Sequence, residues 1–392
     1  MPDSLNSLLE QELLRLTQSG LLRQRRIVRP IDATHVEIDG RACVNFCSNN
    51  YLGLTHHPRL LAAMRRATDT FGAGAGAAPL ISGYSSQHAS AENTIARWKS
   101  TESAIILPSG YQANLAAIQT LAALGKSQKG HSVRFLIDKL AHASLLDAIR
   151  ASDAAWRVFP HNGIEKLHRL LLERDENQLQ VVVTESIFSM DGDAADLAAL
   201  DRLKHETPFV LLLDEAHASG VYGRNGAGFA AEHGLAEIVD IFIVTFSKAA
   251  GCLGGAVCGT EKFCQAVANL GRAYLFSTSI PPALAATIEQ SIGVMRDEPQ
   301  RQRRLRELSK TFRTKLREAG VKVSEGDSPI IPIIVGTESA AMDFSERLSN
   351  QQLLVSAVRP PTVPRGTSRL RITLSSEHTE EEIVKLTNLI VQ

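Results

Sequence analysis

The chain has 392 residues, of which 44% are hydrophobic and 21% charged, so it is long enough to bury a large core. Its 42 Lys and Arg residues equal its 42 Asp and Glu residues in number, so the overall charge gives no reason to expect a nucleic-acid partner. Its apolar runs fall short of the roughly 20 residues that a membrane span requires, and its polar, periodic start is unlike a signal peptide. We therefore expect a globular cytoplasmic protein that does not bind a membrane.

The cysteines argue against a disulfide framework. They form no C-x-x-C pair, and their odd number leaves one over. The five are Cys43, Cys47, Cys252, Cys258 and Cys264. We expect reduced thiols packed in apolar surroundings, and no metal site.

At the start of the chain, leucines recur at near-helical spacing between residues 4 and 26. This pattern predicts an amphipathic N-terminal helix. The predicted helix ends in Arg23, Arg25 and Arg26, a basic end that is more often a solvated helix terminus than a binding site.

Short apolar runs then alternate with helical patterns from about residue 104. The runs are AIILPSG (104–110), FLIDK (135–139), VVVTES (181–186), FVLLLDEAH (209–217) and IFIVTFSK (241–248). Such runs are typical of strands buried on both faces of a mostly parallel sheet, so the middle of the chain is predicted to be α/β. Each run ends in polar or small residues, and ligands bind at the carboxyl ends of strands in open α/β sheets.

The last hundred residues have a different pattern. A charged helical stretch leads to a strand, a helix, a second strand, a Pro-rich loop and a final strand, which predicts a smaller α+β domain. The resulting division is 1–48 for the N-terminal helix and a segment of the small domain, 49–290 for the large domain, and 291–392 for the C-terminal domain.

Lys248 is the first candidate functional residue. It ends the apolar run IVTFSK, and burial at a strand end favours the neutral amine, which attacks aldehydes. An isolated Ser-Lys pair is more often a surface feature, so the prediction depends on the residues around it.

Asp214 ends the run FVLLLDEAH, where its carboxylate would lie in mostly apolar surroundings. A buried carboxylate needs a cationic partner, and a pyridinium nitrogen is one that would keep a cofactor ring electron-withdrawing. His217, three residues further, could donate to the phenolic oxygen of the same ring.

Two nucleotide-binding alternatives are weaker. The tetrapeptide Asp-Glu-Ala-His also occurs in ATP-driven helicases, but the nearest P-loop candidate, TLAALGKS (120–127), has Thr120 where the first glycine is needed. The glycines at 72, 74 and 76 form part of a dinucleotide-binding pattern without a preceding strand, and Pro79 follows where a helix should run. A substrate-side loop is the better interpretation of that segment.

Further candidates lie at other strand ends. Ser109, Gly110 and Tyr111 open a helical pattern after a strand, which predicts either a phosphate site or a plain capped turn. His142 could stack on a planar ring or be an ordinary hydrogen-bonded loop residue. Arg369 and Arg371 should point to opposite faces of a strand, one to bind a carboxylate and the other toward solvent.

Taken together, these residues resemble the α-oxoamine synthase family of pyridoxal-phosphate (PLP) enzymes, from NFCSNNYLGL at 45 to LRITLS at 375. The resemblance implies the fold type I architecture of aspartate aminotransferase. It makes Lys248 the Schiff-base lysine and Cα proton acceptor, and places Asp214 on the pyridine nitrogen and His142 over the ring. Ser189 and His217 would bond the phenolic oxygen.

By the same resemblance, two sets of residues would hold the cofactor phosphate. One set is Ser109, Gly110, Tyr111, Thr245 and Ser247. The other is Ser277 and Thr278 of a neighbouring subunit, so the resemblance implies a homodimer with shared active sites.

Within the family, the strings at 358–375 and FSMDGD favour the biotin-biosynthesis branch, which joins L-alanine to a pimeloyl thioester with loss of CO2. The thioester is carried on coenzyme A or an acyl carrier protein. Arg369 would bind the amino acid carboxylate with Thr362 nearby, and Arg23, with Arg25 and Arg26, could contact phosphates of the carrier.

Two alternatives stay open at this point. One is a related synthase that uses glycine or serine with another acyl-CoA, and the other is a non-catalytic PLP-fold partner protein. The chain departs from the family pattern at Ala141, at Gly163 and at Ala77-Ala78-Pro79.

Overall fold

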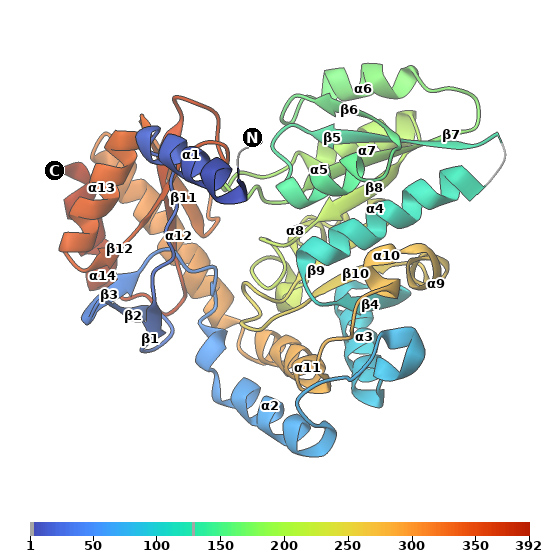
Figure 1. The fold of residues 1–392 in the computed structure, drawn as a ribbon, viewed down its shortest axis with the longest axis horizontal. Helices are drawn as coiled ribbons and strands as arrows, with labels where there is room; N and C mark the ends of the chain where they lie inside the picture. The colour runs from blue at the N-terminus through green and yellow to red at the C-terminus, as the bar shows by residue number, and fades with distance from the viewer. Residues whose placement is uncertain (1–3, 128–129) are drawn as a thin grey trace. The chain divides into compact units, whose positions relative to one another are not determined.

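The computed structural model describes residues 4–127 and 130–392, and the chain divides into two compact units (Figure 1). The small unit comprises Met1–Ser48 with Glu307–Gln392, and the large unit comprises Asn49–Arg306. The sequence-based division set its second boundary at 290, which lies inside helix α11 (Pro282–Asp297). In the structure the division falls within α12 (Gln300–Glu318), so α11 lies wholly in the large unit.

A seven-stranded sheet forms the centre of the large unit, in the order β4-β10-β9-β8-β7-β5-β6. Its strands are β4 (Ser103–Leu107), β5 (Ser132–Asp138), β6 (Ala155–Phe159), β7 (Gln178–Glu185), β8 (Val210–Asp214), β9 (Ile241–Thr245) and β10 (Gly255–Gly259). Pairing is parallel from β6 through β9, and only β10 is antiparallel to its neighbours. The predicted mostly parallel sheet is confirmed, with β6 and β10 as strands that the sequence analysis missed.

The buried strands explain why the apolar runs were so clear. Residues 181–183 of β7 and 211–213 of β8 are fully buried, since helices cover the sheet. Alternate residues of the strands pack in one apolar cluster with the helices α4 (Gly110–Ser127), α5 (Ala143–Arg150) and α9 (Glu261–Leu270). Figure 1 shows α4 running along the sheet. The large unit's other helices are α2 (Pro58–Phe71), α3 (Ser86–Lys99), α6 (Ile164–Leu172), α7 (Leu197–Glu206), α8 (Phe229–Glu232) and α10 (Arg272–Leu275).

The turn from β4 into α4 (Gly110–Ser127) is tightly packed. The Ser109 hydroxyl accepts a hydrogen bond from the Gln112 backbone at 3.2 Å and so caps the helix. A Cβ atom added at Gly255 of β10 would lie 2.5 Å from the Ser109 carbonyl carbon, so only glycine lets this turn approach the sheet. The predicted strand, turn and helix at this point are confirmed.

The structure also settles the two nucleotide-binding alternatives. Residues 120–127 are the last turns of α4, so they cannot form the open loop that a P-loop requires. The segment from Gly72 to Gly76 follows helix α2 and not a strand, and it leads into a π-helical turn, Pro79–Gly83. Neither nucleotide motif has the structural context it needs.

The small unit contains two sheets. Its elements are α1 (Leu5–Gln18), β1 (Val28–Pro30), β2 (His35–Ile38), β3 (Arg41–Asn45), β11 (Ile330–Gly336), α13 (Glu338–Asn350), β12 (Leu353–Leu354), β13 (Ser356–Val358), β14 (Ser368–Thr373) and α14 (Glu380–Val391). One sheet has the order β1-β2-β3-β12 and the other β11-β14-β13. The predicted order of strand, helix, strand and strand is found, with LLVSAV divided between β12 and β13.

Two predictions for the small unit were wrong in detail. Helix α1 ends at Gln18, and Gly20 has a φ of 66°, so Arg23, Arg25 and Arg26 lie beyond the helix and do not end it. Arg371 was expected to alternate toward solvent with Arg369, but both are buried. Residues two apart in a strand lie on the same face, so the two arginines do not alternate, and β14 is the central strand of its sheet with all six residues buried.

Two global features bear on the protein's environment. Among the helices of the described residues, none is both long and apolar enough to cross a membrane. All five cysteines are free, as predicted, and burial raises the pKa of the Cys47 and Cys252 thiols to about 12.

Candidate active site

Lys248 lies three residues beyond β9 and is half-buried. Its Nζ lies 2.8 Å from Nε2 of His217, and Nδ1 of His217 lies 2.7 Å from the Tyr51 hydroxyl. The Tyr51 hydroxyl donates to Oδ1 of Asn49 at 3.1 Å, so its oxygen is placed to accept from Nδ1 of His217. That order of donors makes Nε2 the acceptor that faces the lysine amine.

Asp214 ends β8 and is only 4% exposed. Its Oδ1 accepts from the Ala216 backbone, and its Oδ2 accepts from Nδ2 of Asn114, each at 2.9 Å. Both donors are neutral, and within residues 4–127 and 130–392 no cationic side chain forms an ion pair with Asp214. A buried carboxylate with only neutral donors is suited to binding a cationic group.

His142 is joined to Asp214 through hydrogen bonds. The Asn114 amide donates to the Ser144 hydroxyl at 2.9 Å, and that hydroxyl lies 2.8 Å from Nδ1 of His142, which also accepts from the Ser144 backbone. Nδ1 is therefore an acceptor. Desolvation lowers the pKa of His142, although the Asp214 carboxylate opposes that effect, so the ring is neutral near pH 7.

Glu185 is a buried site residue that the sequence analysis did not single out. It ends β7 directly opposite Asp214 of β8. Burial raises its pKa well above the usual value, and the charge of Asp214 adds to the effect. Glu185 is thus a buried carboxyl whose charged form is disfavoured, at a strand end beside that of Asp214.

The candidate phosphate residues also lie close together. A Cβ atom added at Gly110 would lie 3.2 Å from Cβ of Thr245, so the start of α4 is in contact with the end of β9. The Thr245 and Ser247 hydroxyls are 2.9 Å apart. Two hydroxyls beside the free N–H groups of a helix start are suited to binding a phosphate. The Tyr111 side chain points away from these two hydroxyls, because its own hydroxyl donates to Asp147. Only the backbone of Tyr111 was predicted to bind the phosphate.

Three further predicted residues, Ser189, Ser277 and Thr278, lie in loops. Ser189 is buried in the loop after β7. The Ser277 hydroxyl accepts from Gln112 of the same chain at 3.4 Å, while Thr278 belongs to the loop before α11.

In the small unit, Arg369 donates to the Thr367 carbonyl at 3.1 Å. Arg23 donates to the Pro360 carbonyl at 3.4 Å, and the Thr362 backbone donates to Arg359. Burial and the nearby positive charge of Arg23 lower the pKa of Arg359. These three predicted substrate residues are therefore placed within the small unit alone.

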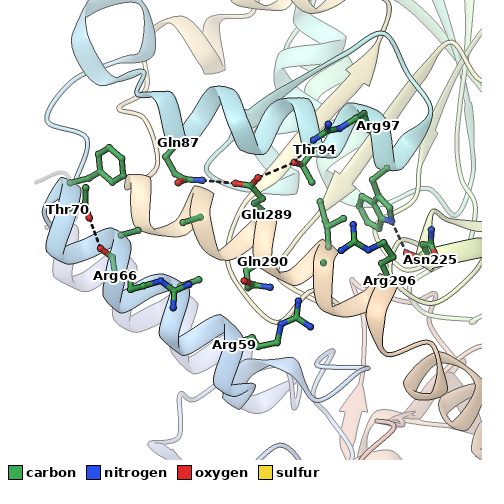
Figure 2. A pocket seen from close by; sticks show the side chains of 17 residues that line it. Arg59, Arg66, Thr70, Gln87, Thr94, Arg97, Asn225, Glu289, Gln290 and Arg296 are labelled. Atoms are coloured by element: carbon green, nitrogen blue, oxygen red, sulfur yellow. Dashed lines mark hydrogen bonds between the residues drawn. The ribbon is translucent and has the colours of Figure 1, made fainter.

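A groove of about 980 Å³ is lined by α2, α3 and α11 of the large unit (Figure 2). Arg59, Arg66, Arg97 and Arg296 line it, and Glu289 within it accepts from Gln87 and Ser90. None of the predicted site residues lines this groove. The candidate active site is therefore defined by the strand ends and not by the large surface groove.

Some of the missed residues had a signal in the sequence. Glu185 ends one of the five predicted strands, and Tyr51 falls in NFCSNNYLGL, a string that already carried the family resemblance. Asn114 had no signal, because it lies within an ordinary helical pattern and reaches Asp214 across 100 residues of sequence.

A mostly parallel sheet with polar groups gathered at the carboxyl ends of its strands is the arrangement expected of a PLP-dependent α/β enzyme. Residues 41–390 match the family described as aminotransferase class I and II. The chain belongs to that family and, within it, to the α-oxoamine synthases.

The assignment to the α-oxoamine synthases is supported by two relatives. The putative 8-amino-7-oxononanoate synthase of Desulforudis audaxviator is 40% identical over 96% of this chain and 95% of its own. The 8-amino-7-oxononanoate synthase of Thioalkalivibrio sulfidiphilus is 37% identical over 96% of this chain and 95% of its own.

Solved structures agree on the fold. Serine palmitoyltransferase of Sphingomonas wittichii has a TM-score of 0.91 at 29% identity, covering 99% of this chain and 98% of its own. An 8-amino-7-oxononanoate synthase from Francisella tularensis has a TM-score of 0.76 at 26% identity, covering 89% and 97%. A structure of SPT with PLP has a TM-score of 0.92 at 29% identity over 99% and 98% of the two chains.

Proposed function

We propose that this chain is an 8-amino-7-oxononanoate synthase. The reaction joins L-alanine to a pimeloyl thioester of coenzyme A or acyl carrier protein, and it releases CO2 and the free thiol carrier. The observation that carries the proposal is the 37–40% identity to relatives of that name over more than nine-tenths of both chains. The large unit's site contains the groups that the chemistry requires.

Asp214 is the strongest indication that the residues fit PLP, because its buried carboxylate has no cationic partner among the described residues. A protonated pyridine nitrogen would supply that charge. When bound, PLP supplies an electron-withdrawing ring that accepts the charge left when a bond to the alanine Cα breaks. Asp214 would keep the ring in its electron-withdrawing form.

Lys248 is proposed as the covalent attachment point for the cofactor and as the acceptor of the alanine Cα proton. Its Nζ lies 2.8 Å from Nε2 of His217, an acceptor that does not require the amine to carry a charge. If Tyr51 donates to Nδ1 instead of accepting from it, Nε2 carries the proton and can donate to an oxygen. Tyr51 can thus supply the proton arrangement that the proposed bond from His217 to the phenolic oxygen needs.

Three further groups complete the proposed cofactor site. His142, whose Nδ1 is occupied by Ser144, offers a neutral ring for stacking. Ser189 would share the phenolic oxygen with His217. The phosphate would bind at the start of α4, between the Gly110 backbone and the hydroxyls of Thr245 and Ser247.

Substrate binding is assigned by resemblance. Arg369 is proposed to bind the alanine carboxylate with Thr362 beside it, and Arg23 to contact the thioester carrier. An Arg369→Lys variant should raise the KM for alanine more than it changes kcat, because the two-pronged guanidinium contact is lost.

A second candidate is a related synthase that uses serine or glycine with another acyl-CoA, and the TM-score of 0.91 with serine palmitoyltransferase favours it. The deciding experiment measures thiol release by PLP-loaded protein. It offers L-alanine, glycine or L-serine against pimeloyl-CoA, acetyl-CoA and palmitoyl-CoA. Release confined to alanine with pimeloyl-CoA supports the first proposal, and release with serine and palmitoyl-CoA supports the second. If none of these pairs reacts, pimeloyl-acyl carrier protein is the next donor to test.

The active site is proposed to be shared between two copies of the chain. Phe276, next to Ser277, is 73% exposed, and Ile81 is 81% exposed. The Ser279 backbone donates to the Ala77 carbonyl at 3.1 Å, which joins the two loops that carry these apolar side chains. A second copy would bury them and bring Ser277 and Thr278 to its phosphate site.

Mixed dimers test this arrangement. A Lys248→Ala chain combined with a Ser277→Ala/Thr278→Ala chain should recover activity, because one of the two sites would be intact. No recovery in a verified heterodimer would contradict the shared site. The free cysteines suit a reducing compartment, so we place the enzyme in the cytoplasm.

A further inference from the structure

Three neighbouring strand ends of the large unit meet at His161, a residue outside the proposed cofactor site. Strands β7, β5 and β6 lie side by side in parallel. Asp138 ends β5, His161 follows β6 by two residues, and residues 187–194 form the loop after β7. Two of these segments lead to proposed cofactor residues, His142 and Ser189.

His161 bonds both of those segments at once. Its Nδ1 lies 3.1 Å from Oδ1 of Asp138, and its Nε2 lies 2.7 Å from Oδ2 of Asp193. A carboxylate only accepts, so both ring nitrogens must donate and the imidazole must be protonated. Burial alone would lower the pKa of His161, but the hydrogen bonds that its ring donates to the two carboxylates raise it to about 10.

The Asp138 carboxylate shapes the turn that carries His142. Its Oδ1 also accepts from the Leu140 backbone at 2.8 Å, and its Oδ2 accepts from the Asn162 backbone at 3.0 Å. The turn ends at His142, the residue that caps α5 (Ala143–Arg150). A shift of Asp138 would therefore move the ring that we propose stacks on the cofactor.

Asp193 closes the loop that carries Ser189. Its backbone carbonyl accepts from Phe188 at 2.9 Å, and Gly192 donates back to the Phe188 carbonyl at 2.8 Å. The edge of the His161 ring packs against Phe188, with ring centroids 4.4 Å apart. Next to His161, the Asn162 amide donates to the Ala194 carbonyl at 3.0 Å and adds a second link to this loop.

We propose that His161 is a positioning residue that bridges Asp138 and Asp193 and thereby fixes His142 and Ser189 against the cofactor. It does not touch the cofactor itself and acts through those two turns. The inference rests on the proposed cofactor residues but not on the proposed substrates.

The test compares His161→Gln and Asp193→Asn with wild type and with His205→Gln, whose histidine side chain is 78% exposed. Gln cannot carry the charge or donate to both carboxylates, and Asn removes the charge of Asp193 with little change in shape. The measurements are the visible absorption and circular dichroism of bound PLP, its Kd, and the far-ultraviolet circular dichroism. No acyl substrate is needed, so a wrong substrate assignment would leave the test intact.

We expect both variants to fold, to show altered cofactor spectra, and to bind PLP about tenfold more weakly, since small misplacements of positioned groups have effects of this size. The His205→Gln protein should match wild type. Added imidazole should restore the spectrum of a His161→Ala protein. Variants that lose thermal stability but keep the wild-type spectrum and Kd would overturn the proposal, because His161 would then be only structural.

Discussion

Two lysines of the large unit, Lys99 and Lys248, differ in the groups that surround their amines. Lys99 is buried at the end of α3, where its Nζ contacts Glu215 and the Ala227 carbonyl and lies 4.6 Å from the Phe242 ring centroid. Lys248 is half-buried and has an imidazole nitrogen of His217 at 2.8 Å. A carboxylate keeps a buried lysine charged, whereas a neutral acceptor leaves its amine available for reaction.

Two adjacent acids at the end of β8, Asp214 and Glu215, repeat this contrast. Glu215 compensates the charge of Lys99, while Asp214, the residue before it, has only neutral donors among the described residues. Glu215 therefore has a cationic partner within the protein. Asp214 has none among the described residues, and we propose that the cofactor supplies one. Adjacent residues of the same charge thus divide into a structural role and a cofactor role.

The largest effect should follow from Lys248→Ala. The protein should fold but lose covalently attached PLP and its absorption band, and activity should fall by at least about a thousandfold. Lys126→Ala, with a side chain 62% exposed, is the matched control and should resemble wild type. Cofactor that remains covalently attached in the Lys248→Ala protein would show that the anchor is elsewhere.

Replacing each acid in turn tests the contrast between them. Asp214→Asn should lower kcat by about a hundredfold or more, because an amide cannot stabilise the charged ring. Glu215→Gln should reduce the free energy of unfolding while kcat of the folded enzyme stays close to wild type. Steady-state kinetics and urea unfolding distinguish the two, and equal kcat losses would contradict the division of roles.

Removing the lysine of the Lys99–Glu215 ion pair should reduce the free energy of unfolding by about 3–5 kcal/mol, the usual effect of leaving a buried charge unpaired. Lys99→Met is the variant, and urea denaturation is the measurement. Adding Glu215→Gln should recover part of the loss, because the unpaired charge is removed and the amide oxygen can still accept from the Ala230 backbone. Absence of recovery would mean that the charge is not the cause.

The smallest effect concerns the pH dependence of stability through His161. Its folded pKa, about 10, lies above the unfolded value of about 6.5. The resulting stabilisation is complete below pH 6.5, decreases as the pH rises, and is lost above pH 10. The difference in free energy of unfolding between wild type and His161→Gln should shrink across this window. A difference that does not change with pH would show that His161 is not charged.

The sequence was most informative where one local rule determined the outcome. Uninterrupted apolar runs predicted five strands correctly, since burial on both faces of a parallel sheet leaves no alternation. The runs AWRVF of β6 and GAVCG of β10 were missed: β6 contains three exposed residues, one of them an arginine, and β10 is rich in small residues. Functional groups at strand ends followed from the same rule, and so Lys248 and Asp214 could be predicted.

The supporting residues could not be found in this way. His161 meets Asp138 and Asp193 across 23 and 32 residues of sequence, and its importance depends on three strands being neighbours. Arg371 gave a wrong expectation for a different reason: residues two apart in a strand share a face, so Arg369 and Arg371 lie together, and β14 is central and buried throughout.

The sequence by itself thus determined the α/β class, the strand ends and the residue types that could hold a cofactor. Only the tertiary structure decided which charges are compensated. It paired Glu215 with Lys99, left Asp214 with the neutral amide of Asn114, and raised the pKa of Glu185 by burial. The physical reason is that the state of a buried ionisable group depends on the distance to its partners in space, and those partners lie far apart along the chain.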